Sequence, residues 1–316
     1  YMVSSPVWAT HASIKTRIGS QRCCSEAGGS EMRTIRSDMI VEQTKRMCIE
    51  ANYNLSENIV KKFQSARQVE PSPLGKEVLQ QLMDNASIAR EEDYPICQDT
   101  GDAVFFVELG QDVRIEDGGL IDAINKGVAQ GYREGYLRFS MVADPLRRRN
   151  TGDNTPAMVT VQLVPGDKLK LSFLAKGGGC ENMSAFRMLT PADGEKGVKE
   201  FVVNTIKNAG GNPCPPVIVG VGLGGTFDQC CMLAKKGLLR EVGERHPDPF
   251  YAQLEGELLE EINKLGIGPM GLGGKTTALA VNVETLPCHI ASLPVAVNMD
   301  CHVHRQKRGQ AELAFH

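Results

Sequence analysis

Three helices are predicted where the regular hydrophobic pattern begins, after residue 31. Apolar residues recur at steps of three and four along residues 40–51, 59–63 and 74–83, which is the spacing of one buried helix face. Ser37 and Ser56 stand directly before the first two stretches, where a serine side chain can accept a free backbone N–H. The chain is therefore expected to start with a helical part capped at Ser37 and Ser56.

Strands and helices alternate in the middle of the chain. Residues 104–109 form an apolar run that predicts a buried strand, and residues 121–135 have helical spacing. Apolar and polar residues alternate in "MVTVQLV" (158–164) and in "LKLSFLA" (169–175), which are separated by the turn sequence Pro-Gly-Asp. Two alternating runs joined by such a turn are typical of a β-hairpin, so these two strands are expected to pair.

The last part of the chain continues the mixed pattern. "SAFRML" and "GVKEFVVNTIKNAG" return to helical spacing, whereas "PPVIVGVG" reads as a buried strand and "TTALAVNVETL" alternates. Asp248 and Pro249 predict the start of a helix that Gly266 ends. The sequence therefore predicts a mixed α/β (α+β) fold, with a helical N-terminal part followed by mixed β-sheets with helices, in one domain over residues 32–316.

Residues 1–31 have a different composition from the rest of the chain. They are polar, rich in Ser and Gly, and show no apolar period. We interpret them as a non-native or disordered N-terminal extension, with Met32 as the natural first residue.

The charge balance narrows the possible partners. The 316 residues include 35 Lys and Arg against 38 Asp and Glu, for a formal net charge of -3, and the only run of one sign is Arg147 to Arg149. This balance argues against nucleic-acid binding. No apolar stretch approaches the length of a membrane span. A soluble, cytoplasmic protein without a membrane or nucleic-acid partner is expected.

The ten cysteines are numerous but scattered. They lack the close, regular spacing of a disulfide framework, and no C-x-x-C pair is present to indicate a zinc ribbon or a thioredoxin-type site. If they bind a metal, they do so singly and from distant points in the chain.

Four glycine-rich loops are candidates for ligand binding: "RNTGDNTPA", "AKGGGCENMS", "GVGLGGTF" and "GIGPMGLGGKTT". The third satisfies the G-x-G-x-x-G pattern of dinucleotide sites, but no second strand is evident over the next fifty residues. The fourth ends like a phosphate loop, yet Pro269 occupies a required glycine position and a strand pattern follows it. We favour loops whose backbone N–H groups approach a small anion; the alternative is that they are only tight turns.

Six segments, read together, carry a family resemblance: "CQDTGDAVFFV", "NTGDNTPA", "KGGGCENMSAFRML", "NPCPPVIVGVGLGG", "GIGPMGLGGKTTALAV" and "LPCHIASLPVAVNMDCHVHR". The set resembles the α subunit, or N-terminal domain, of the class I iron-sulfur-dependent fumarate hydratases, a family that also includes tartrate dehydratase. The segments run from residue 94 to residue 305 in the order of the family.

The resemblance implies a 4Fe-4S cluster held by three separated cysteines, with the fourth iron open to substrate. By motif, the ligands are Cys97, Cys214 and Cys301, which would converge on one cluster site. Cys180 is expected to be no ligand, although its loop belongs to the resemblance.

The resemblance also implies the residues that handle the substrate. Asp99 and His289 are the expected acid pair that protonates the leaving hydroxyl. Four further residues are expected to bind the carboxylates of a small dicarboxylate substrate: Gln98, Arg138, Gly178 and Gly179. The general base belongs, in the family, to a C-terminal domain or to a separate β subunit.

The expected function is therefore that of the α subunit of a fumarate hydratase, which interconverts fumarate and (S)-malate and works with a β subunit in an α2β2 assembly. L-tartrate dehydratase is the alternative within the family. The alternative from another class is a small-anion or dinucleotide-binding module without hydro-lyase chemistry.

Overall fold

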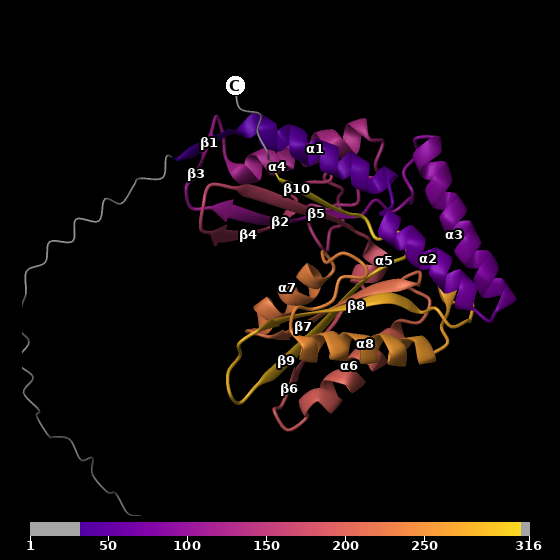
Figure 1. The fold of residues 1–316 in the computed structure, drawn as a ribbon. Helices are drawn as coiled ribbons and strands as arrows, with labels where there is room; N and C mark the ends of the chain where they lie inside the picture. The colour runs from indigo at the N-terminus through magenta and orange to yellow at the C-terminus, as the bar shows by residue number, and fades with distance from the viewer. Residues whose placement is uncertain (1–31, 311–316) are drawn as a thin grey trace, which may run out of the picture. The chain divides into compact units, whose positions relative to one another are not determined.

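Two four-stranded sheets organise residues 32–310, the part of the chain that this computed structural model describes (Figure 1). The prediction of a non-native or disordered extension concerns residues 1–31, which lie outside the described part. The mixed α+β fold class predicted from the sequence is confirmed. None of the helices between residues 32 and 310 is both long and apolar enough to cross a membrane.

The first sheet has the strand order β10-β5-β2-β4. Its strands are β2 (Asp102–Gly110), β4 (Met158–Val164), β5 (Leu169–Lys176) and β10 (Gln306–Gln310). Helices α1 (Ser37–Tyr53) and α4 (Leu120–Glu134) cover one of its faces (Figure 1). A short parallel pair, β1 (Arg33–Arg36) with β3 (Val113–Glu116), extends this layer.

The predicted hairpin between β4 and β5 is wrong, because β2 lies between the two strands. β2 pairs in parallel with β4 and antiparallel with β5. The turn at Gly166 wraps around the end of β2: its carbonyl oxygen accepts a hydrogen bond from Asp112 N at 3.0 Å, and Gly110 N donates to Lys168 O at 2.9 Å. The largely buried β2 thus takes an inner position, where both its edges are paired, and the more exposed β4 lies at the sheet edge.

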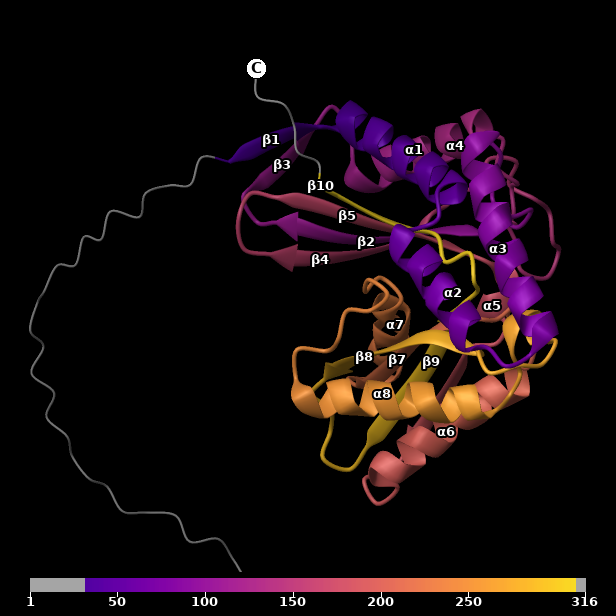
Figure 2. The ribbon, with the colours of Figure 1, turned by 45° about the vertical axis from the view of Figure 1, so that its right-hand side comes forward.

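The second sheet has the order β6-β9-β7-β8. Its strands are β6 (Ala185–Leu189), β7 (Val217–Gly224), β8 (Ala278–Leu286) and β9 (Leu293–Asp300). Helix α7 (Phe227–Gly237) lies on the side that faces the first sheet, and α6 (Gly194–Ala209) and α8 (Pro249–Lys264) lie on the other side (Figure 2). The buried aliphatic side chains of β7 and β9 form the core beneath α6 and α8.

Helices α2 (Glu57–Val69) and α3 (Pro73–Glu91) pack across both sheets. Phe63 and Leu79 share one hydrophobic cluster with Val104 of the first sheet and Ile218 of the second. The smallest elements are the four-residue helix α5 (Gly178–Glu181) and the 3-10 turn η1 (Pro269–Gly271). Because α2 and α3 bind both sheets, they hold the two layers in one arrangement.

Two local predictions were wrong. "SAFRML" forms strand β6 rather than a helix, since six residues are too few for the hydrophobic period to distinguish the two. Ser37 does not cap α1: its hydroxyl donates to Asp117 O at 2.8 Å, and the cap position is Arg36. Ser56 caps α2 as predicted, accepting a hydrogen bond from Asn58 N.

The G-x-G-x-x-G segment is explained by helix packing. Gly220 and Gly222 lie inside β7, and a Cβ on them would approach the carbonyl oxygens of Ala234 and Cys230 in α7 to 2.0 and 2.1 Å. The glycines therefore let α7 lie directly on the strand. They do not form a loop at the end of the strand, where a dinucleotide phosphate would bind.

The loop that resembles a phosphate loop already holds an anion, the side chain of Glu70. The Glu70 carboxylate is buried and accepts hydrogen bonds from Lys275 N at 2.9 Å and Thr276 N at 3.0 Å. The Thr276 hydroxyl donates to the same carboxylate at 3.2 Å. This loop is an anion nest as the glycines suggested, but its occupant is internal and fixes the loop to the segment between α2 and α3.

Candidate active site

Four separate segments of the chain bring cysteines together. Cys97 lies between α3 and β2, Cys180 lies in α5 after β5, Cys214 lies between α6 and β7, and Cys301 follows β9. We call these four residues the cysteine site. All four contribute to the same hydrophobic cluster, Cys180 and Cys301 as buried members and the other two as half-buried ones. The topology explains this convergence. Cys97 precedes β2 and Cys180 follows the antiparallel β5, so both lie at one end of the first sheet; Cys214 precedes β7 and Cys301 follows the antiparallel β9, so both lie at one end of the second.

The three predicted ligands lie close enough to influence one another electrostatically. Burial raises the pKa of the Cys97 thiol, and a negative charge on Cys301 raises it further. Burial likewise raises the pKa of Cys214, with added contributions from charge on Cys301 and Cys97. The structure thus brings Cys97, Cys214 and Cys301 together, as a shared metal group requires.

Cys180 is the immediate neighbour of Cys301. The two sulfur atoms and a carboxylate oxygen of Asp300 lie within 4.8 Å of one another, and all three residues are buried. A hydrogen bond from Cys180 lowers the pKa of the Cys301 thiol, whereas donating that bond raises the pKa of Cys180. The Cys180 thiol also lies 3.4 Å from Pro213 O. Cys301 is therefore the favoured thiolate of this pair and Cys180 the favoured proton donor.

The loop of Cys214 is held in an uncommon conformation. Cys214 has a φ of 53°, in the left-handed region that few residues other than glycine adopt. Its carbonyl oxygen accepts a hydrogen bond from His302 N at 3.3 Å and lies 3.0 Å from His302 Nδ1. These contacts join the segment before β7 to the segment after β9, so the positions of Cys214 and Cys301 depend on each other.

Asp99 lies between two of the glycine-rich segments. One carboxylate oxygen accepts a hydrogen bond from Gly101 N at 3.1 Å, and the other accepts one from Gly178 N at 2.9 Å. A Cβ at Gly177 would lie 3.3 Å from the same carboxylate oxygen that Gly178 binds. The "GGGC" segment therefore approaches a carboxylate as expected of an anion nest, and the orientation of the Asp99 carboxylate is fixed.

Four predicted substrate contacts surround Asp99. Gln98, Gly178, Gly179 and the Arg138 side chain are all exposed. The Arg138 carbonyl accepts a hydrogen bond from the Thr100 hydroxyl at 3.0 Å, which holds the Arg138 segment beside the Asp99 loop. All four residues are thus accessible to a small molecule, and Gly178 is in direct contact with Asp99.

A buried asparagine in "RNTGDNTPA" holds the Arg138 segment in place. Asn154 Oδ1 accepts hydrogen bonds from Ser140 N at 2.6 Å and Met141 N at 3.1 Å, and Asn154 Nδ2 donates to Gly101 O at 3.1 Å. The glycine-rich loop at 149–157 therefore supports the site through its asparagine rather than through its glycine.

His289 is not part of this arrangement within one chain. It is exposed in the loop between β8 and β9, and its Nδ1 accepts a hydrogen bond from Ala291 N at 3.1 Å. Strand β9 separates that loop from Cys301, and its eight residues span about 23 Å. The structure thus places the predicted acid pair, Asp99 and His289, at opposite ends of the second sheet.

Two buried cations beside the cysteine site were missed by the sequence analysis. Arg305 is 2% exposed, and one of its guanidinium nitrogens donates to Asn52 Oδ1 at 3.1 Å and to the Asp99 carbonyl oxygen. Lys176 is also 2% exposed, and its ammonium lies 3.3 Å from a carboxylate oxygen of Glu181. The only sequence signal for either was its place at the end of a recognised segment, which says nothing about burial.

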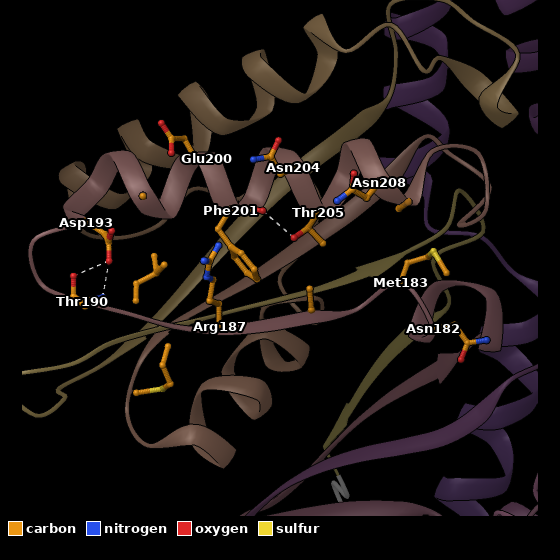
Figure 3. A pocket seen from close by; sticks show the side chains of 15 residues that line it. Asn182, Met183, Arg187, Thr190, Asp193, Glu200, Phe201, Asn204, Thr205 and Asn208 are labelled. Atoms are coloured by element: carbon orange, nitrogen blue, oxygen red, sulfur yellow. Dashed lines mark hydrogen bonds between the residues drawn. The ribbon is translucent and has the colours of Figure 1, made fainter.

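A large pocket lies elsewhere, between β6 and α6 (Figure 3). It has a volume of about 910 Å³ and is lined by polar side chains such as Arg187, Asn204 and Asn208. Asp193 at one end accepts two hydrogen bonds from Thr190. None of the residues predicted from the sequence lines this pocket, so its size does not identify it as the reactive site.

The cysteine site has the donor set of an iron-sulfur centre. Three sulfur ligands come from three separate segments, and thiolate sulfur is the protein ligand that iron-sulfur clusters use. The buried Arg305 and Lys176 supply positive charge next to them, which an anionic thiolate-bound cluster would balance. The residues present therefore fit such a group.

Comparison with known proteins gives the same assignment at family level. The family model described as fumarate hydratase (fumerase) matches residues 41–310. A protein of Methanocaldococcus jannaschii named "Putative L(+)-tartrate dehydratase subunit alpha" is 43% identical over 277 residues, covering 85% of this chain and 95% of the relative. The protein named "L(+)-tartrate dehydratase subunit alpha" of Escherichia coli (strain UTI89 / UPEC) is 35% identical over 267 residues, covering 83% of this chain and 88% of the relative. The counterpart from Escherichia coli (strain K12) is 34% identical over 256 residues, covering 80% of this chain and 84% of the relative.

The family model matches most of the chain, the relatives are 34–43% identical over most of their length, and the chain belongs to the fumarate hydratase/tartrate dehydratase alpha family of hydro-lyases.

Proposed function

We propose that this chain is the α subunit of an iron-sulfur hydro-lyase that dehydrates L(+)-tartrate. The observation that carries the proposal is the convergence of Cys97, Cys214 and Cys301 beside the fixed carboxylate of Asp99. A binding module without chemistry would need neither the three thiols nor a carboxylate held between two loops.

The proposed cofactor is a 4Fe-4S cluster on Cys97, Cys214 and Cys301. When bound, such a cluster with one open iron supplies a Lewis acid for a substrate carboxylate and hydroxyl. The soft sulfur donors and the neighbouring buried cations support this assignment.

Asp99 is the proposed acid for the leaving hydroxyl. In dehydration of tartrate, a proton leaves carbon, hydroxide leaves the adjacent carbon with a proton from the enzyme, and the enol product becomes oxaloacetate. Both Asp99 oxygens accept a backbone hydrogen bond, so the carboxyl group cannot rotate away from the exposed side. Gln98, Arg138 and the Gly178–Gly179 backbone are proposed to bind the substrate carboxylates.

His289 remains a proposed partner of Asp99, but only from a second copy of the chain. It is exposed and lies about 23 Å of strand away from the cysteines of its own chain. Its Nδ1 accepts a hydrogen bond from Ala291 N, which leaves Nε2 as the N–H donor in the neutral ring. A two-fold assembly that contains two α chains would allow each His289 to reach the other site.

A separate β subunit is proposed to supply the general base, in an α2β2 assembly. The relatives are named alpha subunits. The predicted substrate contacts on this chain are exposed on one side, so a second subunit would have to cover them to exclude water from the reaction.

The substrate preference departs from the sequence-based expectation. The motifs led us to expect fumarate first and tartrate as the alternative, whereas the matched relatives named here are tartrate dehydratase subunits. Fumarate remains the second candidate, because the matched family model is described as fumarate hydratase.

The test is anaerobic reconstitution with iron and sulfide, followed by assay with a β subunit. We expect about four irons per chain, and formation of oxaloacetate from L-tartrate that exceeds formation of fumarate from malate. Cys214→Ser should lose most of the iron, and Cys231→Ser, on α7 away from the site, should keep it. Equal iron in both variants would refute the cluster ligands, and higher activity on malate would reverse the substrate order.

A further inference from the structure

Arg305 carries a buried positive charge without a carboxylate partner in the described part of the chain. Its residue is 2% exposed, and none of the ion pairs found between residues 32 and 310 includes it. Its guanidinium Nε is buried and has no hydrogen-bond partner among the described residues. Burying an unpaired charge away from water is strongly unfavourable, so another group must balance it.

The groups around Arg305 identify what balances the charge. The guanidinium binds the carbonyl oxygen of Asp99, two residues after Cys97, and Arg305 itself follows Cys301 by four residues. Asp300, the carboxylate that precedes Cys301 in the chain, is already paired with His304, whose Nδ1 lies 2.7 Å from a carboxylate oxygen. A Cβ on Gly177 would lie 3.3 Å from an Asp99 carboxylate oxygen and 3.6 Å from Arg305 Nη2, so the Asp99 carboxylate and the cysteine ligands are the negative charges left near Arg305.

Arg305 also holds the main chain on which Cys97 and Asp99 lie. Its Nη1 donates to the Asp99 carbonyl oxygen and to Asn52 Oδ1. Asn52 in turn accepts a hydrogen bond from Ile96 N at 2.8 Å and donates to Cys48 O at 2.9 Å. The segment 96–99 is therefore fixed at both ends, by Asn52 before the cysteine and by Arg305 after it, and both are anchored to helix α1.

We propose that Arg305 is a positioning residue of the active site, which holds the 97–99 segment in place and balances the negative charge of the thiolate-bound cluster. The proposal rests on the proposed cysteine ligands. It adds a role for a residue that touches neither the substrate nor the reacting atoms. The charge and the two hydrogen bonds from Nη1 are separate contributions, because a lysine supplies the charge on a different head group that lacks the planar, pre-organised guanidinium geometry.

The experiment compares Arg305→Gln and Arg305→Lys with matched variants at Arg308. Arg308 lies three residues further along on β10, and its guanidinium donates to the Leu239 carbonyl oxygen, away from the cysteines. Each chain is reconstituted anaerobically; iron per chain, the rate of iron loss to a chelator, and the midpoint potential of the bound cluster are measured. Circular dichroism verifies that each variant is folded.

Arg305→Gln is expected to release iron about 10–100-fold faster than wild type, the usual cost of removing a residue that supports a metal ligand. Its midpoint potential should shift to more negative values, because the reduced cluster loses a neighbouring positive charge. Arg305→Lys should keep a potential near that of wild type but release iron faster than Arg308→Lys. If Arg305 only stabilised the fold, the lysine variant would not change the rate of iron release while leaving the midpoint potential near that of wild type.

Two results would overturn the proposal. Arg305→Gln could retain iron and potential at the wild-type values, or Arg305→Lys could release iron as slowly as Arg308→Lys. If Arg305→Gln does not fold, the comparison of Arg305→Lys with Arg308→Lys still tests the proposal. Failure of the wild-type chain and of Arg308→Gln to take up iron would instead refute the cluster itself, so the two proposals are tested separately.

Discussion

Removing the Glu70 carboxylate should destabilise the folded protein, although Glu70 is not one of the proposed active-site residues. The carboxylate accepts hydrogen bonds from three backbone N–H groups, those of Ser72, Lys275 and Thr276, and from the Thr276 hydroxyl. Each buried donor left without a partner costs about 1–3 kcal/mol. Lys275 is exposed, so water can replace one of the lost partners. We therefore expect Glu70→Ala to lower the free energy of unfolding by about 3–5 kcal/mol.

The pH dependence gives a second measure of the same interaction. Burial by itself raises the pKa of Glu70, but the hydrogen bonds from the backbone outweigh it, and the pKa lies below its usual value of 4.5. A carboxyl group whose pKa is lower in the folded state than in the unfolded state stabilises the fold when the pH is above the unfolded-state pKa. That contribution is lost as the pH falls through the folded-state value. The difference in free energy of unfolding between wild type and Glu70→Gln should thus be largest near neutral pH and become smaller below about pH 4.5.

Urea unfolding followed by circular dichroism, at neutral and acidic pH, measures both effects. Glu77→Ala is the matched control, because Glu77 is exposed on helix α3 and its removal should change stability by less than about 0.5 kcal/mol. If Glu70→Ala unfolds at the same urea concentration as Glu77→Ala, the internal carboxylate does not hold the glycine-rich loop. A stability difference that grows at acidic pH would contradict the lowered pKa.

Three further predictions concern the site and the core. Cys180→Ser should retain iron at the wild-type level, as measured by iron analysis after reconstitution, because it is proposed to be no ligand; loss of one iron or more would make it one. Asp99→Asn and His289→Asn should each be inactive when assayed with the β subunit. If the two residues meet across a two-fold interface, an equal mixture of the two variants should recover about a quarter of wild-type activity, because half of the assemblies contain both variants and one of their two sites is intact. No recovery would exclude such pairing. Gly222→Ala should lower the free energy of unfolding by about 2–3 kcal/mol, because a Cβ there would lie 2.1 Å from a carbonyl oxygen of α7. The control is Gly256→Ala in α8, where nothing lies within 4 Å of the new Cβ; it should stabilise the protein slightly. Equal shifts of the two variants in thermal unfolding would contradict the packing argument.

Local patterns predicted the elements more reliably than their pairing. Helix α1 buries Ile40, Thr44 and Met47, which are residues of the predicted face, because a helical period is written in neighbouring positions. The period of β4 and β5 correctly indicated two strands. It could not indicate that β2 lies between them, since hydrogen bonding between strands does not depend on which residues are adjacent in sequence.

The residue types in the sequence indicated the chemistry of the site, but they did not indicate how its residues are arranged in space. The motif resemblance selected Cys97, Cys214 and Cys301, and the structure brings their thiols together. The same motifs selected His289, which the structure places at the far end of β9. A motif records that residues serve one family, and it does not record whether one chain or two supplies them.

The sequence by itself determined the helical N-terminal part, most of the strands, and the candidate ligands, because periodicity and side-chain chemistry are properties of local segments. Only the tertiary structure decided the strand order, the seat of Glu70 in the glycine-rich loop, and the burial of Arg305 beside the cysteines. These features depend on contacts between residues far apart in the chain: Val104 with Met158 in the sheet, Glu70 with Lys275, and Asn52 with Arg305. The energies of such contacts arise from burial and desolvation, which no local pattern along the chain expresses.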